Sequence, residues 1–404
     1  MNKNIKLAVA GAVLALSASA NAGIIIPAGE WTLDVNGNVN AFAIFGKAKD
    51  NNVIAGGLAN VKDTTGESNG QGINTGLLPA WLGFTGTTRQ NDTDVSFTIS
   101  MQPNVSDQAI SGDVKVPLFR QANMTFGDKS WGSVKLGKDI GIFASNAILN
   151  DMTLLGVGAG NAMSGGSTTL GGIGTGYIYA GWKGQVAYTT PNFNGFQATV
   201  GITNPNQGLA STMSTAVTTY NQDRFGLEGQ ANYSFAADNF SGKVWVGGAT
   251  YNVKPTSTSE YTATAADIGL NLNTGNLGLT GYYYTGDGAG SYMFHSNSAS
   301  TTGKKRDSDG GYVQVTYVLP TKTKLGLAYG VSKLDLASGE TTSAQATGGT
   351  QALFSENERM TAGLYHPLTK HLNLVGEYNN IESKAHIGTK NTSQTVSLGA
   401  ILFF

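Results

Sequence analysis

The sequence predicts an all-β protein, a transmembrane antiparallel β-barrel of about sixteen strands. Apolar residues recur at every second position along most of the chain, and the alternating segments are separated by polar links that tend to be short and long in turn. After the N-terminus, no segment is long and apolar enough to cross a bilayer as a helix. A closed barrel fits these observations because its strands satisfy every backbone hydrogen bond without an edge toward lipid.

The N-terminus has the features of a secretory signal peptide over residues 1–22. Lys3 and Lys6 supply the positive start, an apolar run follows, and Ala20-Asn21-Ala22 forms a small-residue cleavage site. The apolar run is too short to span a bilayer. We therefore expect residues 23–404 to form the mature protein, a single exported barrel domain.

Composition excludes several kinds of function. The chain has no cysteine, so neither a disulfide framework nor thiolate chemistry is available. Its formal net charge is -1 at pH 7, and loss of the leader makes it slightly more negative, which argues against a nucleic-acid partner. No motif indicates a cofactor or a metal, and we expect none.

The first expected strand shows the alternation clearly. Leu33, Val35 and Val39 lie on one face, whereas Asp34 and Asn36 begin the other. Comparable patterns predict further strands near 80–84, 95–101, 118–127, 131–138, 178–190, 195–203, 223–236, 240–253, 261–273, 276–286, 308–319, 322–335, 355–368, 371–385 and 390–404.

The links between these strands tend to alternate in length. Short links are expected at 127–131, 190–195, 236–240, 273–276, 319–322 and 368–371, and long ones at 46–77, 102–117, 139–177, 204–222, 287–307 and 336–354. The links at 254–260 and 386–389 fall on the long-loop side although they are short. This plan is typical of outer-membrane barrels, with turns in the periplasm and loops outside.

The last strand alternates strictly and ends on an aromatic residue. Val396, Leu398, Leu402 and Phe404 share one face. This ending resembles the closing strand of bacterial outer-membrane barrels, in which the terminal aromatic is part of the signal read by the barrel-assembly machinery. An ordinary C-terminal edge strand is the alternative interpretation.

Three motifs carry a more specific resemblance. They are Phe119-Arg120-Gln121-Ala122-Asn123-Met124 followed by Trp131-Gly132-Ser133-Val134-Lys135-Leu136-Gly137-Lys138, then Ala80-Trp81-Leu82-Gly83-Phe84-Thr85-Gly86, and Pro191-Asn192-Phe193-Asn194-Gly195-Phe196. Together they resemble the general porins of Gram-negative bacteria, which are sixteen-stranded and trimeric. The resemblance implies that the long third loop, 139–176, folds into the barrel lumen and narrows it.

The same resemblance implies a set of pore-constriction residues. Arg120 matches a wall arginine of the family, Lys138 stands where the family has arginine, and Lys183 lies near another basic position. Asp151 is the candidate acid of the third loop. Trp81 occupies a place where relatives often carry arginine, which suggests a less polar eyelet.

Strand parity supports only part of this set. Lys183 alternates against apolar residues and is expected to face the lumen, as is Lys135. Arg120 and Lys138 instead share parity with apolar neighbours. For these two residues we follow the family match rather than parity.

The expected function is passive diffusion of small hydrophilic solutes and ions across the outer membrane, with weak anion selectivity. The resemblance implies a homotrimer embedded in outer-membrane lipid. A substrate-specific channel is the nearest alternative, with Tyr282 and Tyr284 on the lumen parity. A barrel enzyme is disfavoured because His295 has no obvious matched acid and His366 and His371 bracket an expected periplasmic turn; an adhesive barrel is a further alternative.

Overall fold

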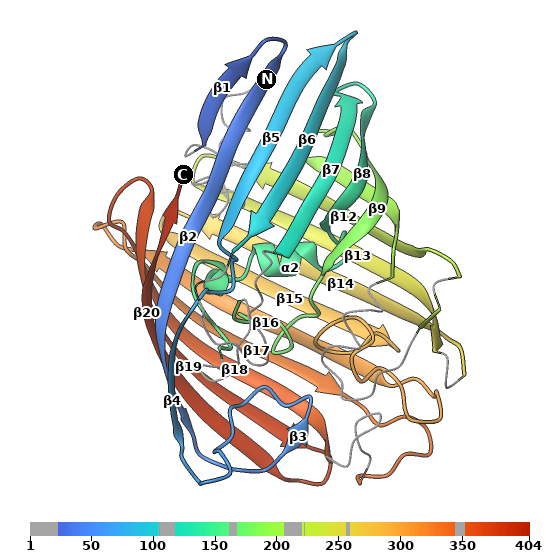
Figure 1. Cartoon of the computed structure of the whole chain (residues 1–404), viewed down its shortest axis with the longest axis vertical. Helices are drawn as coiled ribbons and strands as arrows, with labels where there is room; N and C mark the ends of the chain where they lie inside the picture. The colour runs from blue at the N-terminus through green and yellow to red at the C-terminus, as the bar shows by residue number, and fades with distance from the viewer. Residues whose placement is uncertain are drawn as a thin grey trace.

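The protein is described by a computed structural model covering residues 23–103, 105, 118–160, 168–205, 220–221, 223–255, 259–343 and 352–404. The predicted signal peptide, residues 1–22, lies outside the described residues. Figure 1 shows the chain as a barrel in which the first long strand, in blue, lies beside the last strands, in red.

Sixteen strands form the closed antiparallel wall. They are β2 (Trp31–Ala48), β5 (Trp81–Gln90), β6 (Thr93–Gln102), β7 (Leu118–Asp128), β8 (Gly132–Ile140), β9 (Trp182–Thr189), β10 (Phe196–Thr203), β12 (Gly226–Ala236), β13 (Phe240–Pro255), β14 (Tyr261–Thr274), β15 (Leu277–Asp287), β16 (Asp307–Val318), β17 (Lys324–Leu334), β18 (Ala352–Pro367), β19 (Leu372–Ala385) and β20 (Lys390–Phe403). The wall closes because β20 pairs with β2, for example Phe403 with Asn38. A closed wall removes the free sheet edges that lipid cannot satisfy.

The structure also contains several shorter elements. They are β1 (Ile24–Ala28), β3 (Ile54–Ala55), β4 (Asn69–Asn74), β11 (Tyr220–Asn221), the helix α2 (Ser145–Leu149) and the 3-10 helix η1 (Met152–Leu155). Strand β1 pairs with the start of β2, and β3 pairs in parallel with the start of β18. Within the described part of the chain, no helix is both long enough and apolar enough to cross a membrane.

The predicted sixteen-strand barrel is confirmed, and most strand ends agree within a few residues. The strand expected at 178–190 is the clearest difference, because β9 begins only at Trp182. Ile178 and Ala180 are fully buried in the preceding segment instead of joining the sheet. Strand β1 was not predicted, because three consecutive isoleucines followed by proline show no period-two pattern.

The two faces of the wall differ in chemistry. On β20, Val396 and Leu398 are exposed on the outer face, whereas Thr395 and Ser397 are buried on the inner face. This alternation is what a barrel with a lipid-facing exterior and a polar interior requires. Short turns gather at the top of Figure 1 and the long loops at the bottom.

Candidate functional site

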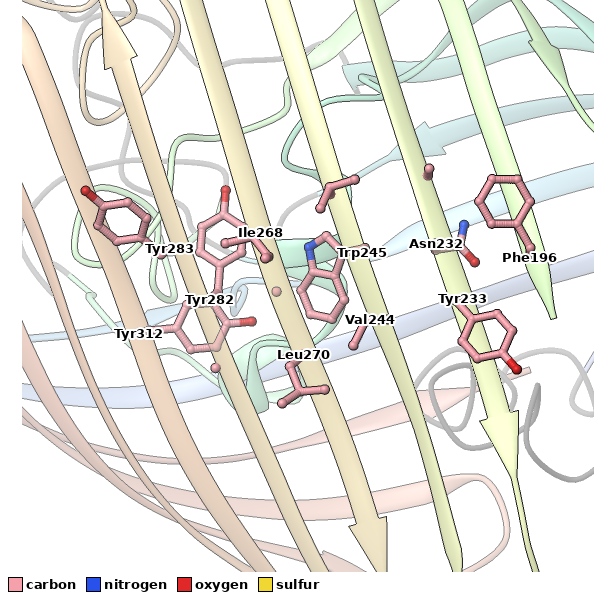
Figure 2. Close-up of a pocket in the computed structure, with 14 residues that line it drawn as sticks. Phe196, Asn232, Tyr233, Val244, Trp245, Ile268, Leu270, Tyr282, Tyr283 and Tyr312 are labelled. Atoms are coloured by element: carbon pink, nitrogen blue, oxygen red, sulfur yellow. The ribbon is translucent and has the colours of Figure 1, made fainter.

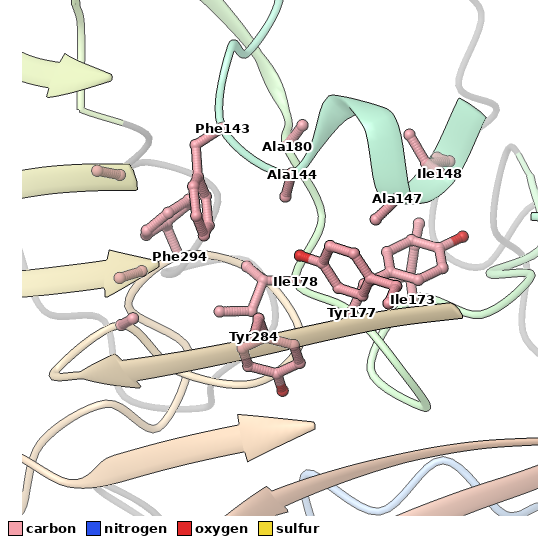
Figure 3. Packing of buried hydrophobic residues seen from close by; sticks show 14 of the residues in the cluster. Phe143, Ala144, Ala147, Ile148, Ile173, Tyr177, Ile178, Ala180, Tyr284 and Phe294 are labelled. Atoms are coloured by element: carbon pink, nitrogen blue, oxygen red, sulfur yellow. The ribbon is translucent and has the colours of Figure 1, made fainter. Parts of the chain in front are cut away.

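The segment 141–181, which joins β8 to β9, makes most of the contacts that define the candidate site. Its Phe143, Tyr177 and Ile178 are fully buried. They pack beside Tyr284 of β15 and Phe294 of the β15–β16 loop, as Figure 3 shows. This apolar packing is supplemented by three carboxylates, which bind the segment at separate points.

The first of these carboxylates is Glu228 of β12. Its Oε2 accepts hydrogen bonds from the backbone N–H groups of Ile142 and Phe143, at 2.6 and 3.0 Å. Its Oε1 accepts from the Lys183 ammonium at 2.5 Å and from the Tyr251 hydroxyl. Glu228 and Lys183 are almost completely buried. Removing either partner therefore leaves an uncompensated charge in the interior.

Aromatic rings complete the surroundings of this ion pair. The Lys183 ammonium lies 5.4 Å from the ring centre of Tyr251 and 5.2 Å from that of Phe294. Tyr251 and Phe294 are themselves in ring contact, at 4.9 Å. Because Phe294 belongs to the β15–β16 loop, residues 288–306, one ion pair contacts both this loop and the start of segment 141–181.

The second carboxylate is Glu377 of β19. Its Oε2 accepts from the backbone N–H groups of Val157 and Gly158 at 3.0 and 2.8 Å, and its Oε1 accepts from Tyr365 at 2.7 Å. Glycine at position 156 permits this approach, because a side chain there would collide with Glu377. Two wall glutamates thus each bind two consecutive backbone amides of the same segment.

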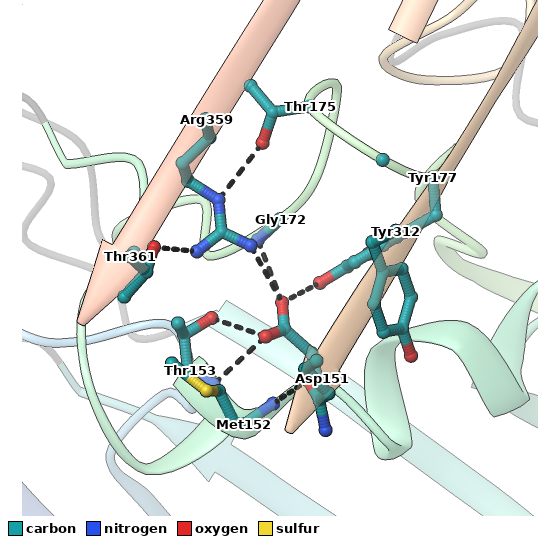
Figure 4. Close-up of polar contacts among 12 residues, drawn as sticks. Asp151, Met152, Thr153, Gly172, Thr175, Tyr177, Tyr312, Arg359 and Thr361 are labelled. Atoms are coloured by element: carbon teal, nitrogen blue, oxygen red, sulfur yellow. Dashed lines mark hydrogen bonds and ion pairs between the residues drawn. The ribbon is translucent and has the colours of Figure 1, made fainter. Parts of the chain in front are cut away.

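The third carboxylate, Asp151, belongs to the segment itself and caps η1. It accepts from the backbone of Thr153 and Gly172, each at 2.9 Å, and from Tyr177 at 2.8 Å. Arg359 of β18 lies 3.9 Å away, and Figure 4 shows how these groups converge on the carboxylate. The carboxylate of Asp151 therefore makes its contacts within the protein, and the residue is almost wholly buried.

A group of aromatic side chains supports the segment from the wall. Trp245 stacks on Tyr282 at 6.5 Å, and Tyr282 stacks on Tyr312 at 5.7 Å. Tyr312 donates to the backbone oxygen of Ala147 in α2, at 2.8 Å. Figure 2 shows these rings beside a pocket of about 750 Å³, whose lining also includes residues of the outer face such as the exposed Ile268. The rings are covered rather than presented to solvent.

Two of the predicted constriction residues lie elsewhere. Arg120 is the extra residue of a bulge between β6 and β7, and its guanidinium lies 6.0 Å from the ring of Trp182. Trp182 lies on the same face of β9 as the exposed Val186. Arg120 also interacts electrostatically with the partly buried Tyr179, so the bulge places it beside Trp182 and segment 141–181 at the loop end of β9.

Lys138 is on the outer face. Its pairing with Ala122 is regular, so Gly137 does not break the register, and its ammonium binds the backbone oxygen of Phe119 at 2.8 Å. Lys135, with the opposite parity, faces the interior and pairs with Asp139 at 2.5 Å. The structure therefore does not bring Arg120 and Lys138 together with Asp151.

The other two predicted constriction residues are Lys183 and Trp81. Lys183 faces inward as expected, but its buried pairing with Glu228 leaves no free charge. Trp81 lies at the start of β5, where its indole N–H binds Asn36 at 3.3 Å and its ring contacts Phe403 at 6.3 Å. Trp81 thus packs at the closing seam of the barrel.

Three residues that organise the site are not among the predicted constriction residues: Glu228, Glu377 and Arg359. Each lies on the inward parity of its strand, opposite apolar outward neighbours such as Leu227, and this signal could have identified them. The backbone N–H groups that the two glutamates bind in segment 141–181 lie 85 to 220 residues away along the chain, which no local pattern reveals.

Two further lysines face inward without an acidic partner within 4 Å in the described residues. Lys243 of β13 binds Asn146 of α2 at 2.6 Å, and Lys324 of β17 lies 4.9 Å from the ring of Tyr365. Within the same described portion, no cluster of three or more histidine, aspartate or glutamate side chains has the arrangement of a metal site.

The turn end of the barrel contains a polar cavity. It measures about 900 Å³ and lies among β2, β5–β10 and their turns. Hydroxyl groups of Thr32, Thr87 and Ser96 line it, together with Arg89 and Asp94, which form an ion pair at 2.8 Å. Such a lining suits water and small polar solutes.

A closed wall with an apolar outside and a polar inside defines an outer-membrane channel. A profile of the Gram-negative porins matches residues 7–386, so the chain belongs to the Gram-negative porin family. The protein is accordingly a diffusion channel of the outer membrane. A search of curated proteins found no matching relative.

Solved structures share this barrel fold. The outer membrane channel DcaP of Acinetobacter baumannii is 17% identical, with a TM-score of 0.68 over 95% of this chain and 100% of that one. The anion-selective porin of Comamonas acidovorans is 14% identical, with a TM-score of 0.61 over 93% and 100%. OmpT of Vibrio cholerae, in a trimer form, is 13% identical, with a TM-score of 0.53 over 93% and 99%. At these identities the likeness concerns the fold alone.

Proposed function

We propose that the channel conducts small hydrophilic solutes passively, with a mild preference for anions, and that segment 141–181 forms its narrowest point. The observation that carries this proposal is the distribution of charge on the inner wall. The interior carboxylates Glu228 and Glu377 are each bound to two backbone amides, whereas Lys243 and Lys324 have no acidic partner within 4 Å among the described residues.

The placement of the constriction follows from contacts of the segment with distant strands. It binds β12 through Glu228, β16 through Gln314 and β19 through Glu377. Each partner lies on the inward parity of its strand. A segment that leaves β8 and reaches all three walls has to pass across the interior, where it reduces the open cross-section.

The preference for anions follows from which charges stay available to ions. Glu228 and Glu377 each accept two backbone N–H groups, which act as fixed positive dipoles beside the carboxylate. Lys243 and Lys324 are only partly buried and raise the potential of the interior. The effect is modest, because salt screens charges beyond about 10 Å at roughly 0.1 M.

Reversal potentials in a salt gradient test this assignment. In planar bilayers the unmodified channel should favour anions, and Lys243→Gln with Lys324→Gln should reduce that preference. Lys138→Gln is the matched control, because it removes the same charge from the outer face. Cation preference in the unmodified channel, or an equal effect of the control, would contradict the proposal.

A substrate-specific channel is the second candidate, and the aromatic residues Tyr282 and Tyr284 are its best support. Both are almost completely buried, so they pack against the segment instead of forming an exposed track. An enzyme has less support, because neither ring nitrogen of His295 has a hydrogen-bond partner in the described part of the chain. Hydrolysis of phospholipid by purified protein would favour the enzyme.

The family resemblance further supports a homotrimer, and OmpT of Vibrio cholerae is a fold neighbour described in a trimer form. Closure of single channels in three equal steps would support a trimer here. We also propose that residues 1–22 are removed on export and that Phe404 is read by the assembly machinery. Deletion of Phe404 should reduce the amount of heat-modifiable folded protein in the outer membrane.

A further inference from the structure

Strands β1 and β20 meet along one edge of β2. Strand β20 pairs with β2 up to Phe404, which exchanges backbone hydrogen bonds with Gly37 at 2.7 and 3.0 Å. Strand β1 takes over on this edge, with Ile24 opposite Val35. Continuing that register places Gly23 opposite Asn36, directly after Phe404.

Asp34 of β2 lies beside this junction with an unsatisfied oxygen. Its Oδ1 is buried and has no hydrogen-bond partner in the described part of the structure. A side chain at position 23 would collide with this same oxygen, so Oδ1 lies against the backbone of Gly23. A buried carboxylate oxygen without a donor is destabilising, and this one points at the residue where we expect processing.

We propose that Asp34 is the counter-ion of the α-ammonium group that signal-peptide cleavage creates at Gly23. The inference rests on the proposed cleavage after Ala22. Hydrolysis consumes one water, releases Ala22 with its carboxylate, and leaves Gly23 with an amine that takes up a proton. The resulting ammonium has three donors and one positive charge, where the uncut chain has a neutral amide with one donor.

The chemistry of residue 23 fits this role. Only glycine leaves room for Oδ1 to approach the α-carbon, and an opposite charge at such short range forms a charge-assisted hydrogen bond. Processing would therefore complete the seam between the two ends of the barrel. The C-terminal carboxylate of Phe404 is the competing acceptor, and the experiment below separates the two.

The first measurement concerns the amine itself. Intact mass of the protein purified from outer membranes should show Gly23 as the first residue, and any other start would overturn the proposal. The rate at which acetic anhydride acetylates the α-amine is then followed by mass spectrometry across pH. A nearby carboxylate raises the pKa of an amine by about one unit, so acetylation near pH 8 should be roughly fivefold slower than for a free terminus.

Variants identify which carboxylate protects the α-amine of Gly23 from acetylation. Asp34→Asn should restore the ordinary acetylation rate, whereas Asp92→Asn, in an exposed turn at the same end of the barrel, should not. Protection that persists in Asp34→Asn would show that Phe404 holds the amine and would overturn the assignment. The measurement is made on folded protein, so a lower yield of the variant does not affect it.

An extended chain tests the charge without changing Asp34. Protein refolded into lipid vesicles with two residues added before Gly23 moves the ammonium away from the carboxylate. Its unfolding temperature should fall by as much as that of Asp34→Asn, and the two changes combined should lower it no further. Full additivity, or no loss in the extended chain, would contradict the proposal.

Discussion

Glu228 and Glu377 both anchor segment 141–181, the first at residues 142–143 and the second at residues 157–158, but they do so in different ways. Each accepts two consecutive backbone N–H groups through one carboxylate oxygen. The other oxygen of Glu228 binds the ammonium of Lys183, whereas that of Glu377 binds only the neutral hydroxyl of Tyr365. The first anchor is therefore an ion pair, and the second is a carboxylate stabilised by dipoles.

This difference affects how each anchor should respond to change. Burial removes water from both carboxylates, but only at Glu228 does a second buried charge depend on the carboxylate. If either Glu228 or Lys183 is removed, the other remains as an unpaired buried charge, and the free-energy cost of its desolvation is no longer offset. At Glu377 a neutral replacement leaves no cation stranded at hydrogen-bond distance.

Replacing Lys183 with methionine should produce the largest loss. The change keeps most of the side-chain volume but leaves the buried Glu228 without its cation, which costs about 3–5 kcal/mol. The free energy of unfolding is measured by urea titration in lipid vesicles. The double variant Lys183→Met with Glu228→Gln should recover part of the loss. A single variant as stable as the unmodified protein would show that the ion pair is not structural.

Glu377→Gln should have a smaller effect on stability. The amide oxygen still accepts hydrogen bonds, but the charge that strengthens them is lost, so we expect a loss of about 1–3 kcal/mol. Because Val157 and Gly158 are then held less firmly, the open-channel current in single-channel records should become noisier. Glu358→Gln, on the outer face of the neighbouring strand, is the control. A loss larger than for Lys183→Met would reverse the comparison.

Asp151→Asn should weaken the middle of the segment by about 1 kcal/mol or somewhat more. The cap of η1 keeps an accepting oxygen, but the charge opposite Arg359 at 3.9 Å is lost. Comparison with Asp151→Asn in an Arg359→Gln background measures the coupling between the two residues. If the losses of stability caused by the two single changes simply add, Arg359 is not coupled to Asp151 and stabilises the site through its hydrogen bonds to Thr175 and Thr361 instead.

At neutral pH the smallest effect is expected at His295, beside the first anchor, because its contribution to stability appears only on acidification. Burial beside Phe294 and Tyr251 lowers the pKa of His295, in the β15–β16 loop, from 6.5 to about 4. Since the unfolded state takes up a proton first, this histidine should reduce stability as pH falls from about 6.5 toward 4. His295→Gln should flatten the pH dependence of unfolding in this window, and His371→Gln, in a turn at the other end of the barrel, should not.

Much of the wall was predictable because lipid outside and a polar interior enforce an alternation that appears in every strand. Leu33, Val35 and Val39 already mark one face of β2, and Lys183 already faces inward by parity. Lys138 lies on the outer face that its parity indicates, whereas Arg120 lies at a bulge, where parity does not apply. The bulge at Arg120 was not predictable, because it arises from the pairing of β7 with β6.

Most strands and turns, and the face on which most side chains lie, were predictable from the residues alone, because these features depend on neighbours two residues apart. The charges that find a partner were not predictable in this way, because the partners are distant along the chain. Lys183 meets Glu228 across 45 residues, and Glu377 meets Val157 across 220. Such partners are brought together by closure of the barrel. An inward charge that meets a buried partner becomes a structural contact, and one that does not remains available to ions in the pore.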